Sequence, residues 1–303
     1  MKFLLFSDLH YAPGQFLSGS FEILHEIQAA AERENCDFII HAGDFCHGPT
    51  KVMDFVKEYN DFHIPSYHCL GNHDADNSTF EDAVKYYNMP GEYYYFDCKG
   101  YRMIVLNPNY YKVDGEYVNF SMQNYFAHGA ERDWVPPAQL EWLKQTIDSS
   151  PYPCLLISHE SFERENGVQN RREVREVINA ANKKTPGKVL MCMNGHYHRD
   201  YIRILDGVCY FDVNSVLMEW VSGVTHNLYP AELCAEYRSL NHTVIYNDPL
   251  YCIVELDGTT IDIKGKESSM YLGLTREDVG GTPFDKVGRP CTPKIQSAKI
   301  TLG

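Results

Sequence analysis

The chain has 303 residues, of which 44% are hydrophobic and 13% aromatic, enough for a sizeable core in one large domain or two small ones. Its formal net charge of -14 argues against tight binding of polynucleotides, because such binding depends on clusters of basic residues. No apolar run approaches the roughly 20 residues that span a bilayer, so we expect no membrane association.

The cysteines predict a reducing compartment. None of the ten is in Cys-x-x-Cys spacing, and Cys154, Cys192, Cys209 and Cys252 lie inside or beside apolar runs, as small buried hydrophobic residues do. The apolar start of the chain, residues 2–6, is too short for the core of a signal peptide. We therefore expect a cytoplasmic protein.

The N-terminal part predicts alternating strands and helices. Residues 3–6 and 38–40 are short apolar runs typical of buried strands, and an amphipathic helix over residues 21–31 separates them. This order predicts parallel strands, with the loops that follow them at the same edge of a sheet. A second helix over residues 52–59 and a strand over residues 64–70 repeat the pattern.

The remaining elements predict a pair of sheets that contain both parallel and antiparallel strands. Residues 107–134 are aromatic and polar without a clear period, and we interpret them as a long loop over the pocket. The other predicted elements are a helix at 79–88, strands at 93–96 and 101–106, a helix from Pro136-Pro137, a strand at 154–157, a helix around 174–178, a strand at 188–193, and antiparallel strands at 208–211, 243–246, 250–256 and 259–263.

No internal repeat or linker divides the chain. We expect one domain over residues 1–264, with an aromatic insertion at about 214–242, and an irregular arm over residues 265–303 packed on it.

Polar groups follow five of the predicted strands. Burying them without partners would be costly, so they are expected to face a site at the edge where α/β sheets carry theirs. Carboxylate and imidazole ligands without thiolate favour Mn, Fe, Zn or Co, and there are more of them than one ion needs, so a binuclear site with one bridging carboxylate is expected. The motifs are Asp8-Leu9-His10, Gly43-Asp44, Gly71-Asn72-His73-Asp74, Ser158-His159 and Gly195-His196-Tyr197-His198.

In this order, the five motifs resemble those of the calcineurin-like metallophosphoesterase family, and the resemblance covers about residues 1–215. It implies an α/β fold, a four-layer α-β-β-α sandwich of two mixed sheets. It also implies a hydroxide that bridges two ions and attacks the phosphorus. The resemblance assigns ligands to two ions: Asp8, His10 and His198 to the first, Asn72, His159 and His196 to the second, and Asp44 to both. It implies that His73 is an acid that binds no ion and that Asp74 fixes the tautomer of His73.

Two features narrow the implied substrate. Gly43-Asp44 is followed by Phe45-Cys46-His47-Gly48 and lacks the Asp-Arg-Gly of protein serine/threonine phosphatases. The motifs resemble instead the bacterial branch of small-molecule and cyclic-nucleotide phosphodiesterases. We expect hydrolysis of a small phosphodiester such as a nucleotide, with a small-molecule phosphomonoesterase as the alternative and a noncatalytic metal-binding scaffold as a weaker one. A zinc peptidase is disfavoured, because the chain has no His-Glu-x-x-His.

Three further residues are candidates for substrate contact. His47 lies three residues after Asp44 and could touch substrate or lie behind the ligands. Arg164 and Arg199 flank two of the histidine motifs and could bind a phosphate in bidentate fashion. Aromatic residues could stack on a base or simply pack; they are Tyr110, Tyr111, Tyr125, Trp134, Trp220 and Tyr229.

Overall fold

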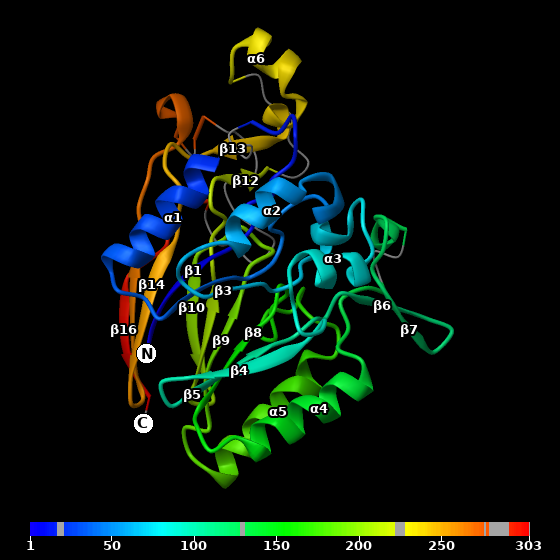
Figure 1. The fold of residues 1–303 in the computed structure, drawn as a ribbon, viewed down its shortest axis with the longest axis vertical. Helices are drawn as coiled ribbons and strands as arrows, with labels where there is room; N and C mark the ends of the chain where they lie inside the picture. The colour runs from blue at the N-terminus through cyan, green and yellow to red at the C-terminus, as the bar shows by residue number, and fades with distance from the viewer. Residues whose placement is uncertain (17–20, 128–130, 222–227, 276, 279–290, 303) are drawn as a thin grey trace.

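The computed structural model describes residues 1–16, 21–127, 131–221, 228–275, 277–278 and 291–302. Two six-stranded sheets lie face to face, with helices α1 and α2 outside one sheet and α4 and α5 outside the other (Figure 1). The four-layer α/β sandwich expected from the sequence is therefore confirmed. The helices are α1 (Phe21–Arg33), α2 (Met53–Asn60), α3 (Phe80–Tyr86), α4 (Pro137–Ser149), α5 (Arg171–Lys184) and α6 (Ala231–Glu236). Short 3-10 helices span Pro49–Lys51, Asn72–Ala75, Asn124–Phe126, Arg238–His242 and Tyr271–Gly273.

The first sheet has the strand order β16-β15-β14-β1-β2-β3. β1 pairs in parallel with β2, and β2 with β3, whereas β14, β15 and β16 pair antiparallel. The predicted strand, helix, strand unit is thus confirmed, and the loops after β1 and β2 share one edge. The bounds are β1 Lys2–Phe6, β2 Phe38–His41, β3 Ser66–Tyr67, β14 Cys252–Asp257, β15 Thr260–Gly265 and β16 Ala298–Thr301.

The second sheet has the order β10-β11-β9-β8-β5-β4. Its four central strands are parallel, and an antiparallel strand closes each side. Its bounds are β4 Tyr94–Cys98, β5 Tyr101–Val105, β8 Cys154–Ile157, β9 Val189–Asn194, β10 Tyr201–Leu205 and β11 Val208–Asp212. Two separate ribbons complete the strands, β6 (Tyr110–Val113) with β7 (Glu116–Asn119) and β12 (Met218–Trp220) with β13 (Thr243–Ile245).

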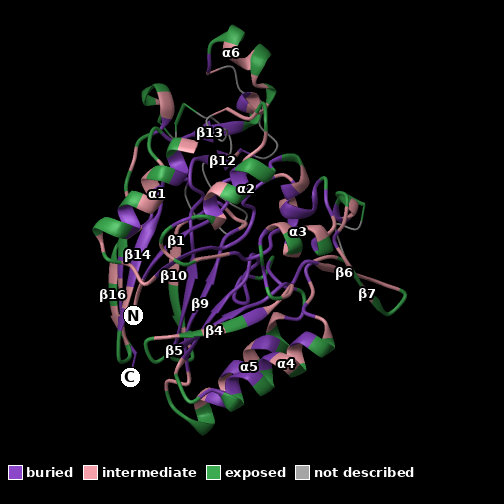
Figure 2. Cartoon of the chain, in the orientation of Figure 1, coloured by how far each residue is buried: buried purple, intermediate pink, exposed green. Residues whose placement is uncertain are grey.

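The central strands are buried on both faces. In β5, Met103 and Val105 belong to the cluster between the sheets, whereas Ile104 belongs to the cluster under α4 and α5. Successive residues of a strand face opposite sides, so a strand covered on both sides needs a continuous apolar run. Figure 2 shows these strands buried, between helices that expose one face.

The third predicted strand is shorter than residues 64–70. β3 spans Ser66–Tyr67 at the edge of the first sheet, where Pro65 has no N–H to donate. Beyond it, the carbonyl of Leu70 accepts a hydrogen bond from Asn109 Nδ2 (2.9 Å) instead of a strand partner. The chain therefore leaves the sheet before the motif that begins at Gly71.

The prediction of a long loop over residues 107–134 is wrong for much of the segment. β6 and β7 form a hairpin whose turn, Asp114-Gly115, has φ of 52° and 88°, the backbone of a type I′ turn. Glu92 holds the hairpin by accepting hydrogen bonds from Tyr110 Oη (2.7 Å) and Asn119 Nδ2 (2.8 Å). Residues 128–130 lie outside the described part of the chain.

The C-terminal third is more regular than predicted. Residues 214–242 contribute β12 and α6, and β12 pairs with β13; residues 222–227 of this insertion are not described. In the segment expected to be an irregular arm, β16 pairs with β15 and extends the first sheet. Hydrogen bonding to that sheet, rather than a strong apolar pattern of its own, makes the segment a strand.

All ten cysteines are free thiols, and Cys154, Cys192, Cys209 and Cys252 are buried. Among the described residues, no helix is both long and apolar enough to cross a membrane.

Candidate metal centre

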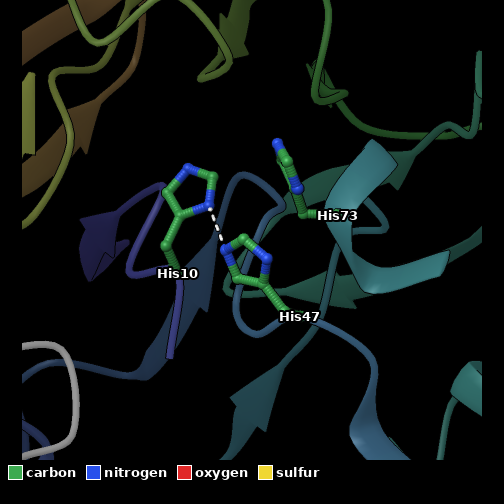
Figure 3. A group of neighbouring side chains, drawn as sticks. All are labelled: His10, His47 and His73. Atoms are coloured by element: carbon green, nitrogen blue, oxygen red, sulfur yellow. Dashed lines mark hydrogen bonds between the residues drawn. The ribbon is translucent and has the colours of Figure 1, made fainter. Parts of the chain in front are cut away.

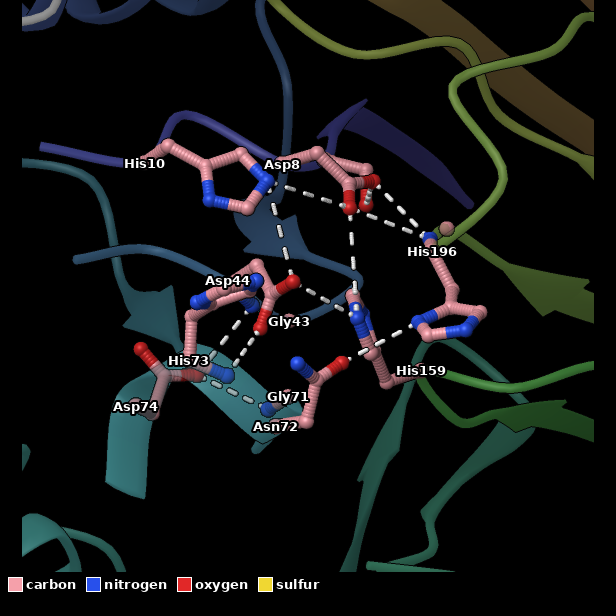
Figure 4. A network of polar contacts seen from close by, with 12 residues as sticks. Asp8, His10, Gly43, Asp44, Gly71, Asn72, His73, Asp74, His159 and His196 are labelled. Atoms are coloured by element: carbon pink, nitrogen blue, oxygen red, sulfur yellow. Dashed lines mark hydrogen bonds and ion pairs between the residues drawn. The ribbon is translucent and has the colours of Figure 1, made fainter. Parts of the chain in front are cut away.

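Acidic and histidine side chains converge where the parallel strands of both sheets end (Figure 4). Asp8 and His10 follow β1, Asp44 follows β2, and Asn72 lies on the 3-10 helix after β3. The loops after β8 and β9 bring three histidines from the second sheet. The structure thus brings together all the side chains proposed as ligands: Asp8, His10, Asp44, Asn72, His159, His196 and His198.

The first group joins Asp8, His10 and His198. His10 Nε2 lies 3.0 Å from His198 Nε2, and His198 Nε2 lies 3.3 Å from Asp8 Oδ1. All three side chains are buried. Nitrogen atoms that each bind one ion at about 2.1 Å lie about 3 Å apart when they subtend a right angle, so this group has the spacing of a ligand set.

The second group joins Asp44, His159 and His196, with Asn72 beside them. His159 Nε2 lies 2.9 Å from Asp44 Oδ2, and His196 Nδ1 lies 3.1 Å from Asn72 Oδ1. Asp44 also reaches the first group, since its Oδ2 is 3.7 Å from His10 Nε2. A carboxylate between the two groups is the arrangement that a bridging ligand requires.

His159 and His198 each turn Nε2 toward the centre. His159 Nδ1 donates to the carbonyl of Ala42 (2.7 Å) and His198 Nδ1 to that of Met218 (2.7 Å), so in each neutral ring Nε2 is unprotonated. His159 Nε2 faces the Asp44 carboxylate at 2.9 Å. Buried acceptors that face one another need a cation between them, and the side chains therefore fit metal ions.

The same charge distribution acts on the proton of His159. Burial lowers the pKa of this ring, yet Asp44 raises it well above its ordinary value. The centre therefore attracts positive charge, as a proton or as a metal ion.

Several residues of this centre have a left-handed backbone. Asp8, His10, Asp44, His196 and His198 have φ between 50° and 70°, a region that residues other than glycine seldom adopt. Such conformations persist only where the surroundings hold them, and they cluster at functional sites. Here the left-handed backbone turns the side chains of each short loop toward the centre.

Gly71 leaves room for Asp44. A Cβ at Gly71 would lie 2.3 Å from both the backbone nitrogen and Oδ1 of Asp44, closer than any real contact. We expect Gly71→Ala to destabilise the fold by about 1–3 kcal/mol, as overpacking does, and to weaken metal binding. Thermal unfolding and metal titration would measure both effects. Gly91→Ala is the matched control, since its Cβ would meet only the Tyr93 carbonyl at 3.4 Å; equal behaviour of the two variants would contradict the argument.

His73 lies beside the two groups and is held by Asp76. Its Nδ1 donates to Asp76 Oδ2 (2.8 Å), and its backbone N–H donates to Asp44 Oδ1 (2.7 Å). Burial opposes a charge on His73, but Asp44 and Asp76 raise its pKa. Tyr125 Oη donates to the other oxygen of Asp76 (2.5 Å). The imidazole is therefore oriented through Nδ1.

The role predicted for Asp74 is wrong. Its carboxylate accepts hydrogen bonds from the backbone N–H groups of Asp44, Phe45, Cys46 and Gly71 and from Tyr87 Oη, and it does not bond His73. Burial and Asp44 raise its pKa to about 7. Asp74 thus positions the loop that carries Asp44, and Asp76 orients His73. The signal overlooked in the sequence is a second acidic residue three positions after His73, one helical turn away.

His47 connects the acid to the first group (Figure 3). Its Nδ1 lies 2.9 Å from Asp76 Oδ2, and its Nε2 lies 3.2 Å from His10 Nδ1. With its proton on Nδ1, His47 accepts from His10, which leaves His10 Nε2 free to bind an ion. The sequence left two roles open for His47, contact with the substrate or support of a ligand from behind. This contact with His10 assigns it the second role.

The two arginines predicted to reach a phosphate are engaged elsewhere. Arg164 is 2% exposed, pairs with Asp212 (Nη1 to Oδ2, 3.2 Å) and lies 3.7 Å over the ring of Tyr197. Arg199 is 4% exposed and forms an ion pair with Glu219. Both predictions of substrate contact are therefore wrong, because β11 of the second sheet and the β12–β13 ribbon supply acidic partners for these buried side chains.

Two of the aromatic candidates border the centre. The ring of Trp220 lies 6.1 Å from that of His10, nearly perpendicular to it, and Tyr125 lies 6.0 Å from His73. The side chains of Tyr110 and Tyr229 instead support local structure, through Glu92 and the backbone N–H of Ile245.

A binuclear donor set of aspartates, histidines and an asparagine, on this sandwich of two mixed sheets, defines a metal-dependent phosphoric ester hydrolase. The chain belongs to the calcineurin-like phosphoesterase family, whose model matches residues 1–200. None of the curated proteins matches it in sequence.

Solved structures share the fold. One is a dimetal phosphatase from Danio rerio, with a TM-score of 0.64 and 14% identity over 100% of this chain and 99% of the other. Another is GAP50, the anchor in the inner membrane complex of Plasmodium, with a TM-score of 0.51 and 12% identity over 100% of this chain and 89% of the other. At these identities the likeness establishes the fold alone.

Proposed function

We propose that the protein hydrolyses a small phosphodiester, such as a nucleotide, at a centre of two transition-metal ions. The observation that carries the proposal is the pair of ligand groups, Asp8 with His10 and His198 and Asp44 with His159 and the half-buried His196, whose ligand atoms lie within 4.8 Å of one another in each group. Mn, Fe and Zn suit this mixture of carboxylate and imidazole.

In this proposal Asp44 serves both ions, and Asn72 completes the second group. Two bound ions supply Lewis-acid chemistry: they lower the pKa of a water nucleophile and neutralise charge on the phosphoryl oxygens. His73, oriented by Asp76, donates a proton from Nε2 to the departing oxygen. His47 and Asp74 hold His10 and the Asp44 loop in place.

The preference for a diester is supported by the form of the motifs. Phe45-Cys46-His47 follows Asp44, without the Asp-Arg-Gly of protein phosphatases. A small-molecule phosphomonoester is the alternative substrate, because the same ligands could bind either phosphate. A noncatalytic scaffold is a weaker alternative, since the chain keeps His73 and every proposed ligand.

We also propose the setting in which this chemistry takes place. Ten free thiols support a cytoplasmic location, and the net charge of -14 supports a small substrate over a polynucleotide. Residues 1–264 would form the phosphoesterase domain, with the insertion at 214–242, and residues 265–303 would pack on it; the pairing of β16 with β15 supports this packing.

The test is hydrolysis of bis(p-nitrophenyl) phosphate beside p-nitrophenyl phosphate, by protein stripped of metal and reloaded with Mn²⁺. Faster turnover of the diester is expected. Faster turnover of the monoester would move the assignment to a phosphomonoesterase. Two bound ions without turnover of either ester would contradict hydrolysis and favour the scaffold.

A further inference from the structure

Arg132 lies at the border of the centre, beside the residues that hold His73. Its guanidinium carbon is 5.8 Å from the centre of the Tyr125 ring, and Tyr125 Oη donates to Asp76. Tyr125 is fully buried, whereas the Arg132 side chain is 27% exposed. The guanidinium therefore lies where the protein interior meets solvent, beside the tyrosine whose hydroxyl is 3.3 Å from Nδ1 of the proposed acid, His73.

The backbone around Arg132 is held on both sides. Arg132 pairs with Tyr111 of β6, and the neighbouring bonds run from Lys112 N to Glu131 O (2.8 Å) and from Trp134 N to Tyr110 O (3.1 Å). Asp133 has φ of 72°, and its carbonyl accepts a hydrogen bond from Gln169 N (2.8 Å). A strained residue fixed by several hydrogen bonds is the kind of support that functional positions have.

The charge of Arg132 is only partly compensated. Within the described part of the chain, its ion-pair partner is Asp133, whose Oδ2 lies 3.4 Å from Arg132 Nε. At 3.4 Å this pair is longer than a charge-assisted hydrogen bond of about 2.7–2.9 Å, so the carboxylate compensates the guanidinium incompletely.

We propose that Arg132 binds an anionic phosphate oxygen of the substrate. A guanidinium presents several N–H donors in one plane and matches phosphate oxygens, and Arg164 and Arg199 are buried against carboxylates. The inference rests on the proposed function, since it assigns a second contact to the same substrate. The oxygen belongs either to the phosphate that is cleaved or to a second phosphate of the same molecule.

The experiment compares Arg132→Gln and Arg132→Lys with wild type, all loaded with Mn²⁺. The substrates are bis(p-nitrophenyl) phosphate, p-nitrophenyl phosphate, and the p-nitrophenyl ester of thymidine 5′-phosphate with and without a 3′-phosphate. We expect Arg132→Gln to lower kcat/KM by about 10- to 100-fold, the effect of losing a hydrogen bond to a charged group, with partial recovery in Arg132→Lys. Metal content and melting temperature should stay unchanged, and calorimetry should show weaker binding of inorganic phosphate.

The matched control is Arg33→Gln, at the exposed end of α1, which should behave as wild type.

A loss on all four esters assigns Arg132 to the cleaved phosphate, and a loss only on the ester with a 3′-phosphate assigns it to a second phosphate. Unchanged kcat/KM and unchanged phosphate binding in Arg132→Gln would overturn the inference and leave the proposed function intact. Inactivity of wild type on every ester would instead refute the proposed function, and phosphate binding would still test Arg132.

Discussion

Replacing Asp44 with Asn is expected to lower turnover by about 10³-fold or more and to release much of the bound metal. The carboxylate reaches His159 Nε2 at 2.9 Å and His10 Nε2 at 3.7 Å, so it contacts both ligand groups, and its Oδ1 accepts the backbone N–H of His73. An amide of the same shape carries no negative charge and presents a single acceptor oxygen. Metal analysis and turnover of bis(p-nitrophenyl) phosphate would measure the two losses.

Asp148→Asn provides the control for Asp44→Asn, because Asp148 is an exposed residue of α4 that pairs with Lys184. It should keep both the metal content and the turnover of wild type. Full activity of Asp44→Asn at normal metal content would refute the bridging role.

Replacing His73 with Asn should leave the metal in place while turnover falls by about 10²–10⁴-fold on esters with poor leaving groups. The ring lies beside the two ligand groups and is tied to Asp76 through Nδ1, so its loss removes a proton donor and no metal ligand. Nitrophenyl esters should be less affected, because their leaving group needs little protonation. The measurement is turnover of alkyl and nitrophenyl esters at matched metal content.

Asp76→Asn tests the orientation of the same ring. It should reproduce the dependence on the leaving group with a smaller loss, since His73 stays but is no longer held by a carboxylate. His63→Asn, at an exposed position, should match wild type. Loss of metal from the His73 variant would show that His73 is a ligand and would overturn its assignment as the acid.

From the sequence, the candidate ligands at the strand ends were predicted more accurately than the residues that position them. Asp8, Asp44 and His159 each directly follow a buried apolar run, so the strand pattern and the chemistry pointed to the same edge. Asp76 was missed because it lies outside the motif, one helical turn after His73, whose ring it orients. Arg164 and Arg199 were misjudged because their acidic partners, Asp212 and Glu219, come from distant parts of the chain.

The missed hairpins had local signals. Asp114-Gly115 and Asp206-Gly207 each have positive φ at both residues and join antiparallel strands, as Asp-Gly pairs do in type I′ turns. The aromatic composition around the first pair obscured the alternation of a strand. β16 had no comparable signal, because its partner β15 supplies the hydrogen bonds that define it.

A left-handed backbone serves catalysis in this protein but lowers its conformational stability. The residues concerned are Asp8, His10, Asp44, His196 and His198. Each such residue costs of order 1–3 kcal/mol, which the rest of the fold must offset. A chain under selection for thermostability alone would therefore replace these residues with glycine or asparagine and lose its ions. Conversely, ions that bind only the folded chain return part of that free energy by mass action, so the melting temperature should follow metal supply. The amount of folded protein in a cell would then depend on the supply of these metal ions.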